Sequence, residues 1–192
     1  MGLAVSALAL IAAAWAQALP AQSEAVDPKT FPLLVFRQFC LTSQGNNSTL
    51  LRDLKQMKAS HPKLLAEISS ADDRAKLLGN DYPVGWVFSP AEKDKPFWLG
   101  ASGGGNCEVS LFGSTSQLKE QFETELQEYA AQNGGKFYLS GDTSFLEDKS
   151  KTGFAYTVDL PKSTAYVMIL QSDENVGEVG HPVQLMSIFE PK

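Results

Sequence analysis

The order of hydrophobic and polar residues divides the chain into a helical first part and a later part made mostly of strands. In residues 31–60 apolar side chains recur every three or four positions, which predicts two amphipathic helices. The first helix carries Cys40 on its inner face. The second ends before Pro62, because the residue that precedes a proline is disfavoured in helical geometry. The stretch 62–80 is predicted to form one or two further short helices.

After residue 80 the period changes to two, which indicates half-buried strands. A long amphipathic helix interrupts them at residues 114–133, before a glycine pair. The sequence therefore predicts the α+β class, with N-terminal helices and a mostly antiparallel sheet interrupted by one long helix. The predicted strands lie at residues 84–88, 97–99, 107–111, 136–141, 153–161, 164–172 and 182–190.

The N-terminal segment has the pattern of an export signal. Residues 1–18 contain no charged side chain, and small residues flank Gln17, which predicts a signal peptide cleaved before Leu19. A retained membrane anchor is the alternative, although this apolar run is short for a bilayer. Residues 19–30 are then a flexible N-terminus and 31–192 a single α+β domain, with no membrane span after signal cleavage.

Net charge narrows the range of partners. The formal net charge is −6 at pH 7. Binding to a phosphate backbone needs a basic surface, so we expect no nucleic-acid partner.

The chain has two cysteines, Cys40 and Cys107. An even number in an exported chain favours a structural disulfide. Two unpaired thiols are an alternative. A redox or nucleophilic role is another, but no Cys-x-x-Cys spacing supports a redox role.

The three consecutive glycines at residues 103–105 do not form a phosphate-binding loop. Such a loop needs a helix after it, with backbone N–H groups pointing at the anion. Here a strand pattern follows the glycines and no lysine lies nearby. The segment therefore predicts a hairpin turn between two strands.

Candidate catalytic groups are few. His61 and His181 each precede a proline, and neither belongs to a recognisable nucleophile, metal or cofactor motif. We therefore expect no cofactor, no metal and no catalytic residue identifiable from the sequence. One alternative is a secreted hydrolase assembled in the fold around His181 with Asp142 or Asp173. Another is an inhibitor of a secreted enzyme that uses the segment 141–152.

Four aromatic residues form the densest apolar cluster. They are predicted to lie mainly in the core. If the sheet face without helices is concave, they could line a ligand site instead. The residues are Trp86, Phe88, Phe97 and Trp98.

Three segments carry a resemblance to short exported bacterial proteins of unknown function. They are an apolar helix with one cysteine, "FRQFC", a tryptophan segment, "VGWVF", and a strand with the second cysteine, "NCEVSLFG". The likeness covers residues 31–130. It implies periplasmic residence and a Cys40–Cys107 bridge, and it brings no activity.

Together these features predict an exported soluble protein, periplasmic or secreted. Its expected role is that of a non-catalytic binding module. The expected partner is a small apolar ligand, a peptide or another envelope protein.

Overall fold

The computed structural model describes residues 30–78, 82–89, 96–101, 105–142, 150–173 and 182–192. The predicted signal peptide, and the predicted flexible N-terminus apart from Thr30, lie outside the described residues.

Helices form most of the first part of the chain and one later connection. The first predicted helix begins at Phe31 and continues from an α-helix into a π-helical stretch that carries Cys40. The second begins after Asn46, whose side chain accepts a hydrogen bond from the backbone N–H of Thr49. The helices are α2 (Phe31–Val35), η1 (Phe36–Leu41), α3 (Asn47–Ser60), α4 (Ala71–Leu78) and α5 (Thr115–Gln132).

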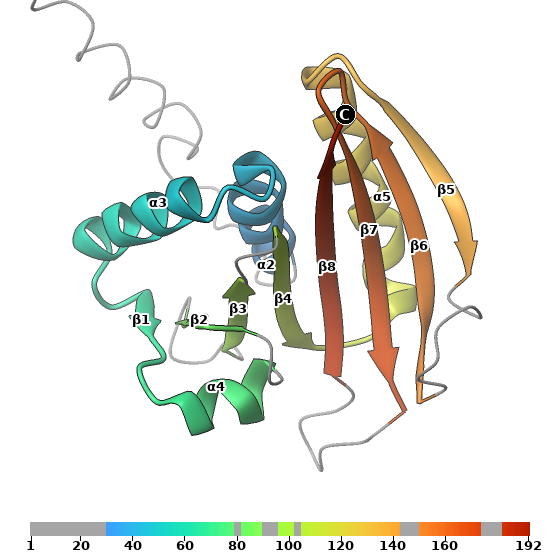
Figure 1. Cartoon of the computed structure of the whole chain (residues 1–192). Coiled ribbons are helices and arrows are strands. Elements are labelled where there is room, and N and C mark those ends of the chain that lie inside the picture. The colour runs from blue at the N-terminus through green and yellow to red at the C-terminus, as the bar shows by residue number, and fades with distance from the viewer. Residues whose placement is uncertain (1–29, 79–81, 90–95, 102–104, 143–149, 174–181) are drawn as a thin grey trace, which may run out of the picture.

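Eight strands within the described residues form one antiparallel sheet, in the order β1-β2-β3-β4-β8-β7-β6-β5. Two four-stranded meanders meet where β4 pairs with β8, and α5 connects the end of β4 to β5 at the far edge (Figure 1). The α+β prediction is confirmed. The strands are β1 (Leu65–Glu67), β2 (Val84–Phe88), β3 (Phe97–Ala101), β4 (Asn106–Phe112), β5 (Lys136–Asp142), β6 (Lys151–Asp159), β7 (Ser163–Ser172) and β8 (Pro182–Pro191).

The prediction for residues 62–80 was wrong in part. Only α4 is helical there, and β1 precedes it as an edge strand paired with β2. Leu65 and Ile68 have helical spacing, but Leu65 belongs to the main core and Ile68 to a smaller cluster under α4. Tertiary packing therefore separates two side chains that a local helix would place on one face.

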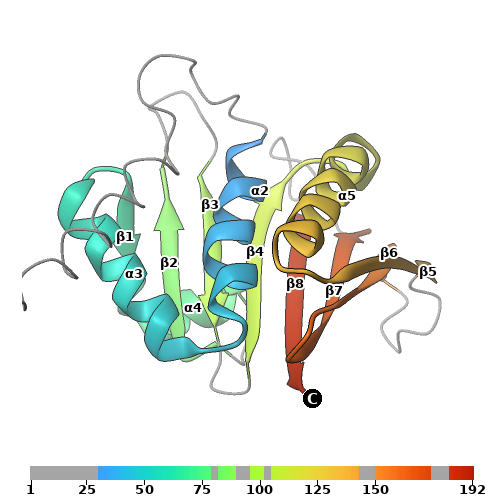
Figure 2. The same cartoon turned by 90° about the horizontal axis from the view of Figure 1, so that it is seen from above.

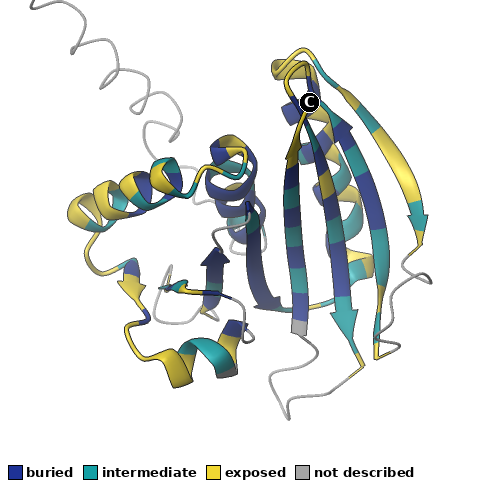
Figure 3. Ribbon diagram, viewed as in Figure 1, coloured by how far each residue is buried: buried dark blue, intermediate teal, exposed yellow. Residues whose placement is uncertain are grey.

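Helices α2, η1 and α5 lie side by side on one face of the sheet, which we call the first face (Figure 2). The main hydrophobic core fills the space between these helices and the strands. Figure 3 shows that β3 and β4 are largely buried, whereas the edge strand β5 is mostly exposed. Burial is therefore most complete at β3 and β4, close to the central β4–β8 pairing that lies below η1.

A disulfide fastens η1 to β4 within this core. Cys40 and Cys107 are bonded, with Cα atoms 5.3 Å apart, and both are buried. Beside them, a Cβ on Gly45 would lie 3.1 Å from the Cα of Gly105. Both glycines have positive φ angles, 77° and 81°, which favour glycine. The predicted disulfide is confirmed, and a close glycine–glycine contact lets the end of the helix approach the start of β4.

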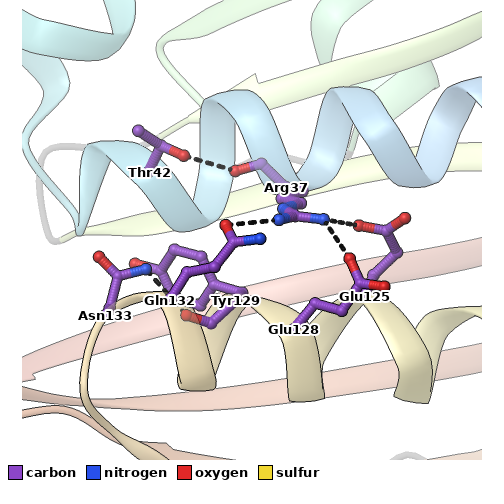
Figure 4. Close-up of polar contacts among 7 residues, drawn as sticks. All are labelled: Arg37, Thr42, Glu125, Glu128, Tyr129, Gln132 and Asn133. Atoms are coloured by element: carbon purple, nitrogen blue, oxygen red, sulfur yellow. Dashed lines mark hydrogen bonds and ion pairs between the residues drawn. The ribbon is translucent and has the colours of Figure 1, made fainter. Parts of the chain in front are cut away.

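The guanidinium of Arg37, in η1, forms a fork of hydrogen bonds to side chains of α5 (Figure 4). Its Nη1 donates to Oε2 of Glu125 at 2.6 Å and to Oε2 of Glu128 at 3.1 Å, and its Nη2 donates to Oε1 of Gln132 at 2.7 Å. Partial burial disfavours the charged guanidinium, but the two carboxylates outweigh this effect and raise the pKa of Arg37. The fork therefore fixes the two helices against each other across the first face.

No helix among the described residues is long and apolar enough to cross a membrane.

Candidate ligand-binding face

The described elements cover only part of the opposite side of the sheet, which we call the second face. Helix α4 packs on it over β2 and β3. Figure 1 looks onto the second face of β5 to β8, with α5 behind the strands. No helix in the described part of the chain covers those four strands on this side. Some side chains there, such as Tyr166 and Met168, are exposed or partly exposed, whereas Leu170 is buried.

Apolar side chains of β7 and β8 gather on this uncovered area. Met168 lies opposite Met186 in the register, and Tyr166 lies opposite Ile188. Tyr166 is 43% exposed, and both methionines and Ile188 are partly exposed. We call Tyr166, Met168, Met186 and Ile188 the methionine patch, and Leu170, beside them on β7, is buried. Methionine is flexible and polarisable, so such a patch suits an apolar ligand of irregular shape.

A buried acidic group lies next to the patch, in β4. Glu108 is opposite Met186 in the register and is only 1% exposed. Its Oε1 accepts a hydrogen bond from the hydroxyl of buried Ser110 and another, at 2.8 Å, from Nε2 of Gln184. A glutamate is rarely this buried unless it is paired, so this position requires an explanation.

The contact with Glu108 fixes the orientation of the Gln184 amide. A carboxylate oxygen accepts hydrogen bonds, so the amide NH2 group must face it. The amide carbonyl Oε1 of Gln184 is then on the side away from Glu108. No described residue donates a hydrogen bond to that oxygen, and Gln184 is partly exposed. The second face thus presents one oriented hydrogen-bond acceptor beside apolar side chains.

None of the ion pairs between described residues includes Glu108. Its two partners, Ser110 and Gln184, are neutral. A negative charge on a buried glutamate held only by neutral donors is costly in a medium of low dielectric constant. In its ionised form, this side chain would act on charged groups that approach the nearby part of the second face.

Helix α4 and the residues around it close one flank of this area. Ile68, Leu78 and Tyr82 form a small apolar cluster to which Trp98 of β3 adds. Trp98 also contacts Phe112 edge-to-face, with ring centroids 5.4 Å apart. Its cross-strand neighbour on β4 is Ser110, the partner of Glu108. Trp98 is therefore the aromatic residue that connects α4 to the polar group.

The four aromatic residues predicted as possible ligand-lining groups lie on different faces. Trp86, Phe88 and Phe97 are buried in the main core on the first face, where the rings of Phe88 and Phe97 stack at 5.0 Å. Trp98 alone among the four lies on the second face, partly exposed. Strand alternation separates Trp98 from Phe97, its neighbour in sequence.

The candidate catalytic groups are not brought together in the described part of the chain. His61 follows α3 and is exposed, and His181 lies outside the described residues. Asp142 and Asp173 are exposed, at the ends of β5 and β7. Of the segment 141–152 proposed for an inhibitor, residues 143–149 also lie outside. No group of metal-ligating side chains occurs among the residues that the structure describes.

Sequence reasoning missed the three polar residues of the second face. Glu108 and Ser110 alternate with Cys107, Val109 and Leu111, and polar residues in such a pattern normally face solvent, so nothing in the sequence singles them out. Gln184 is 76 residues away from Glu108 and comes beside it only through the β4–β8 pairing.

Comparison of the chain with protein families, with curated proteins and with solved structures finds no match.

Proposed function

We propose that this protein is an exported binding protein whose second face receives a small amphipathic ligand. One observation carries the proposal: buried Glu108, whose partners among the described residues are all neutral, lies next to the partly exposed methionine patch. Core packing would favour an apolar residue at such a position, because a buried charge costs stability. A ligand site combines apolar walls with a few oriented polar groups, and this arrangement has both.

Export is the second part of the proposal. The buried Cys40–Cys107 disulfide supports it, because structural disulfides persist in oxidising compartments and are rare in the cytosol. The apolar segment 1–18 supplies the matching signal.

Mass spectrometry of the protein purified from its source under denaturing, non-reducing conditions tests export. The expected mass is that of a chain beginning at Leu19, less two hydrogens for the disulfide. A chain that keeps residues 1–18, or thiols that react with an alkylating agent before reduction, would contradict this part of the proposal.

Methyl NMR of methionine tests binding at the second face. The chain has four methionines, and beyond the N-terminal one they are Met57, Met168 and Met186. Met57 packs against the core of the first face, so it serves as an internal control. Titration with 1-naphthylmethanol or decanol is expected to shift the methyl signals of Met168 and Met186 and leave Met57 unchanged. If neither probe moves the two second-face signals, the binding proposal is wrong.

A further inference from the structure

We infer that the ligand of the second face carries a protonated amine, which binds to Oε1 of Gln184 above the charge of Glu108. This inference rests on the proposed function and specifies the polar end of the ligand. It follows from three features of the described residues: the orientation of one amide, the charge behind it, and the apolar surface beside it.

The amide supplies the direct contact. Gln184 gives its Nε2 hydrogen to Glu108, so its Oε1 remains as an acceptor on a partly exposed side chain. An acceptor in that position selects ligand groups with an N–H or O–H donor. It disfavours a carboxylate or phosphate, which would place two acceptors together.

The charge decides between a neutral donor and a cation. Glu108 is buried and its hydrogen bonds come from the neutral groups of Ser110 and Gln184. An ammonium group near Gln184 would lie one side chain away from this carboxylate, where the attraction is screened far less than at an exposed site. Glu108 thus acts through Gln184 as a positioning residue and also supplies the field that favours a cation.

The apolar part of the ligand has its place in the methionine patch. Met186 is the neighbour of Glu108 across the β4–β8 pairing, and Met168 is the next residue along the same row. An alkyl or aryl group attached to the amine can therefore cover both methionines while the amine stays at Gln184. The chemistry that fits is a small amphipathic amine.

A matched pair of probes tests the inference. Binding of 1-naphthylmethylamine and 1-naphthylmethanol is measured at neutral pH, by calorimetry and by the methyl signals of Met168 and Met186. The amine is expected to bind about tenfold or more tightly than the alcohol, because it alone carries a charge. The preference is expected to persist at about 0.5 M salt, since a buried charge is poorly screened.

Two variants and one control identify the residues responsible. In Glu108→Gln the charge is removed, but a side-chain carbonyl remains to accept from Nε2 of Gln184, so the amine is expected to lose its advantage and to bind within about twofold of the alcohol, whose own binding changes little. Gln184→Met, at a partly exposed position, is expected to weaken both probes by removing the acceptor. Glu190→Gln removes an exposed carboxylate at the end of β8 and is expected to change neither.

The outcomes separate the inference from the proposed function. Equal binding of the two probes by the wild type, with shifts at Met168 and Met186, would overturn the inference and leave the binding function standing. An amine preference that survives Glu108→Gln, or that disappears at high salt, would also overturn it, because a surface charge would then be the cause. No shift at either methionine with any probe would overturn both.

Discussion

The two faces of the sheet are built from the same strands and have opposite physical characters. On the first face the helices cover a continuous core, a disulfide joins η1 to β4, and Arg37 is paired with two carboxylates of α5. On the second face methionines are partly exposed, and the buried Glu108 is hydrogen-bonded to the neutral side chains of Ser110 and Gln184. The first face therefore supplies stability that the second face does not. A polar group that costs stability can be kept on the second face because the first compensates for it.

Removal of the disulfide is expected to have the largest effect on stability. In the double variant Cys40→Ala, Cys107→Ala, the free energy of unfolding is expected to fall by about 4 kcal/mol, because the bridge restricts a long loop of the unfolded chain. The measurement is urea denaturation followed by tryptophan fluorescence. A loss below about 1 kcal/mol would mean that the bridge is not a main source of first-face stability.

A pair of single truncations compares the two faces directly. Leu126 of α5 is fully buried in the first-face core, so Leu126→Ala is expected to cost about 3 kcal/mol. Met168→Ala removes a partly exposed side chain of the second face and is expected to cost less than about 1 kcal/mol. Denaturation of both variants under the same conditions gives the difference between their losses of unfolding free energy. Equal losses of unfolding free energy in the two variants would contradict the conclusion that the first face supplies more stability than the second.

The smallest expected effect is a pH dependence of the folding stability, which comes from Tyr156 on the first face. Burial and a hydrogen bond to Glu123 raise the pKa of Tyr156. The unfolded chain releases this proton near pH 10, its ordinary value, whereas the folded chain retains it to higher pH. The contribution of Tyr156 to stability is therefore complete below about pH 10 and decreases as pH rises above it.

Comparison with Tyr156→Phe isolates this contribution, since other groups titrate in the same range in both proteins. Thermal unfolding between neutral pH and about pH 11 is expected to show a steeper loss of stability in the wild type than in the variant. Parallel curves for the two proteins would show that Tyr156 does not contribute.

Much of the fold could be predicted from local patterns. The long amphipathic stretch became α5, the alternating stretches became strands, and the cysteine pair became a disulfide. These features depend on short-range periodicity or on simple counting. The strand β1 escaped prediction because its three residues are held by pairing with β2, which local spacing does not reveal. The π-helical stretch of η1 escaped it too, since its residues have an ordinary helical pattern.

The candidate site could not be predicted from the sequence, for a different reason. Alternation placed Glu108 and Ser110 on the side of β4 away from the core, and a glutamate there normally faces water. Its burial depends on elements packed over the second face, and its contact with Gln184 depends on which strand lies beside β4. Neither the burial of Glu108 nor its contact with Gln184 can be predicted from the residues next to Glu108 in the sequence.

The junction between β4 and β8 has a consequence for the order in which the chain can fold. Each half of the sheet pairs strands that follow one another in the sequence, whereas the pairing between the halves needs β8, which follows all the other described strands. A chain made from its amino end contains both cysteines of the bridge well before β8 exists. It cannot pair the two halves, or place Gln184 beside Glu108, until β8 has been made. Completion of the second face is therefore a late event in the synthesis of the chain.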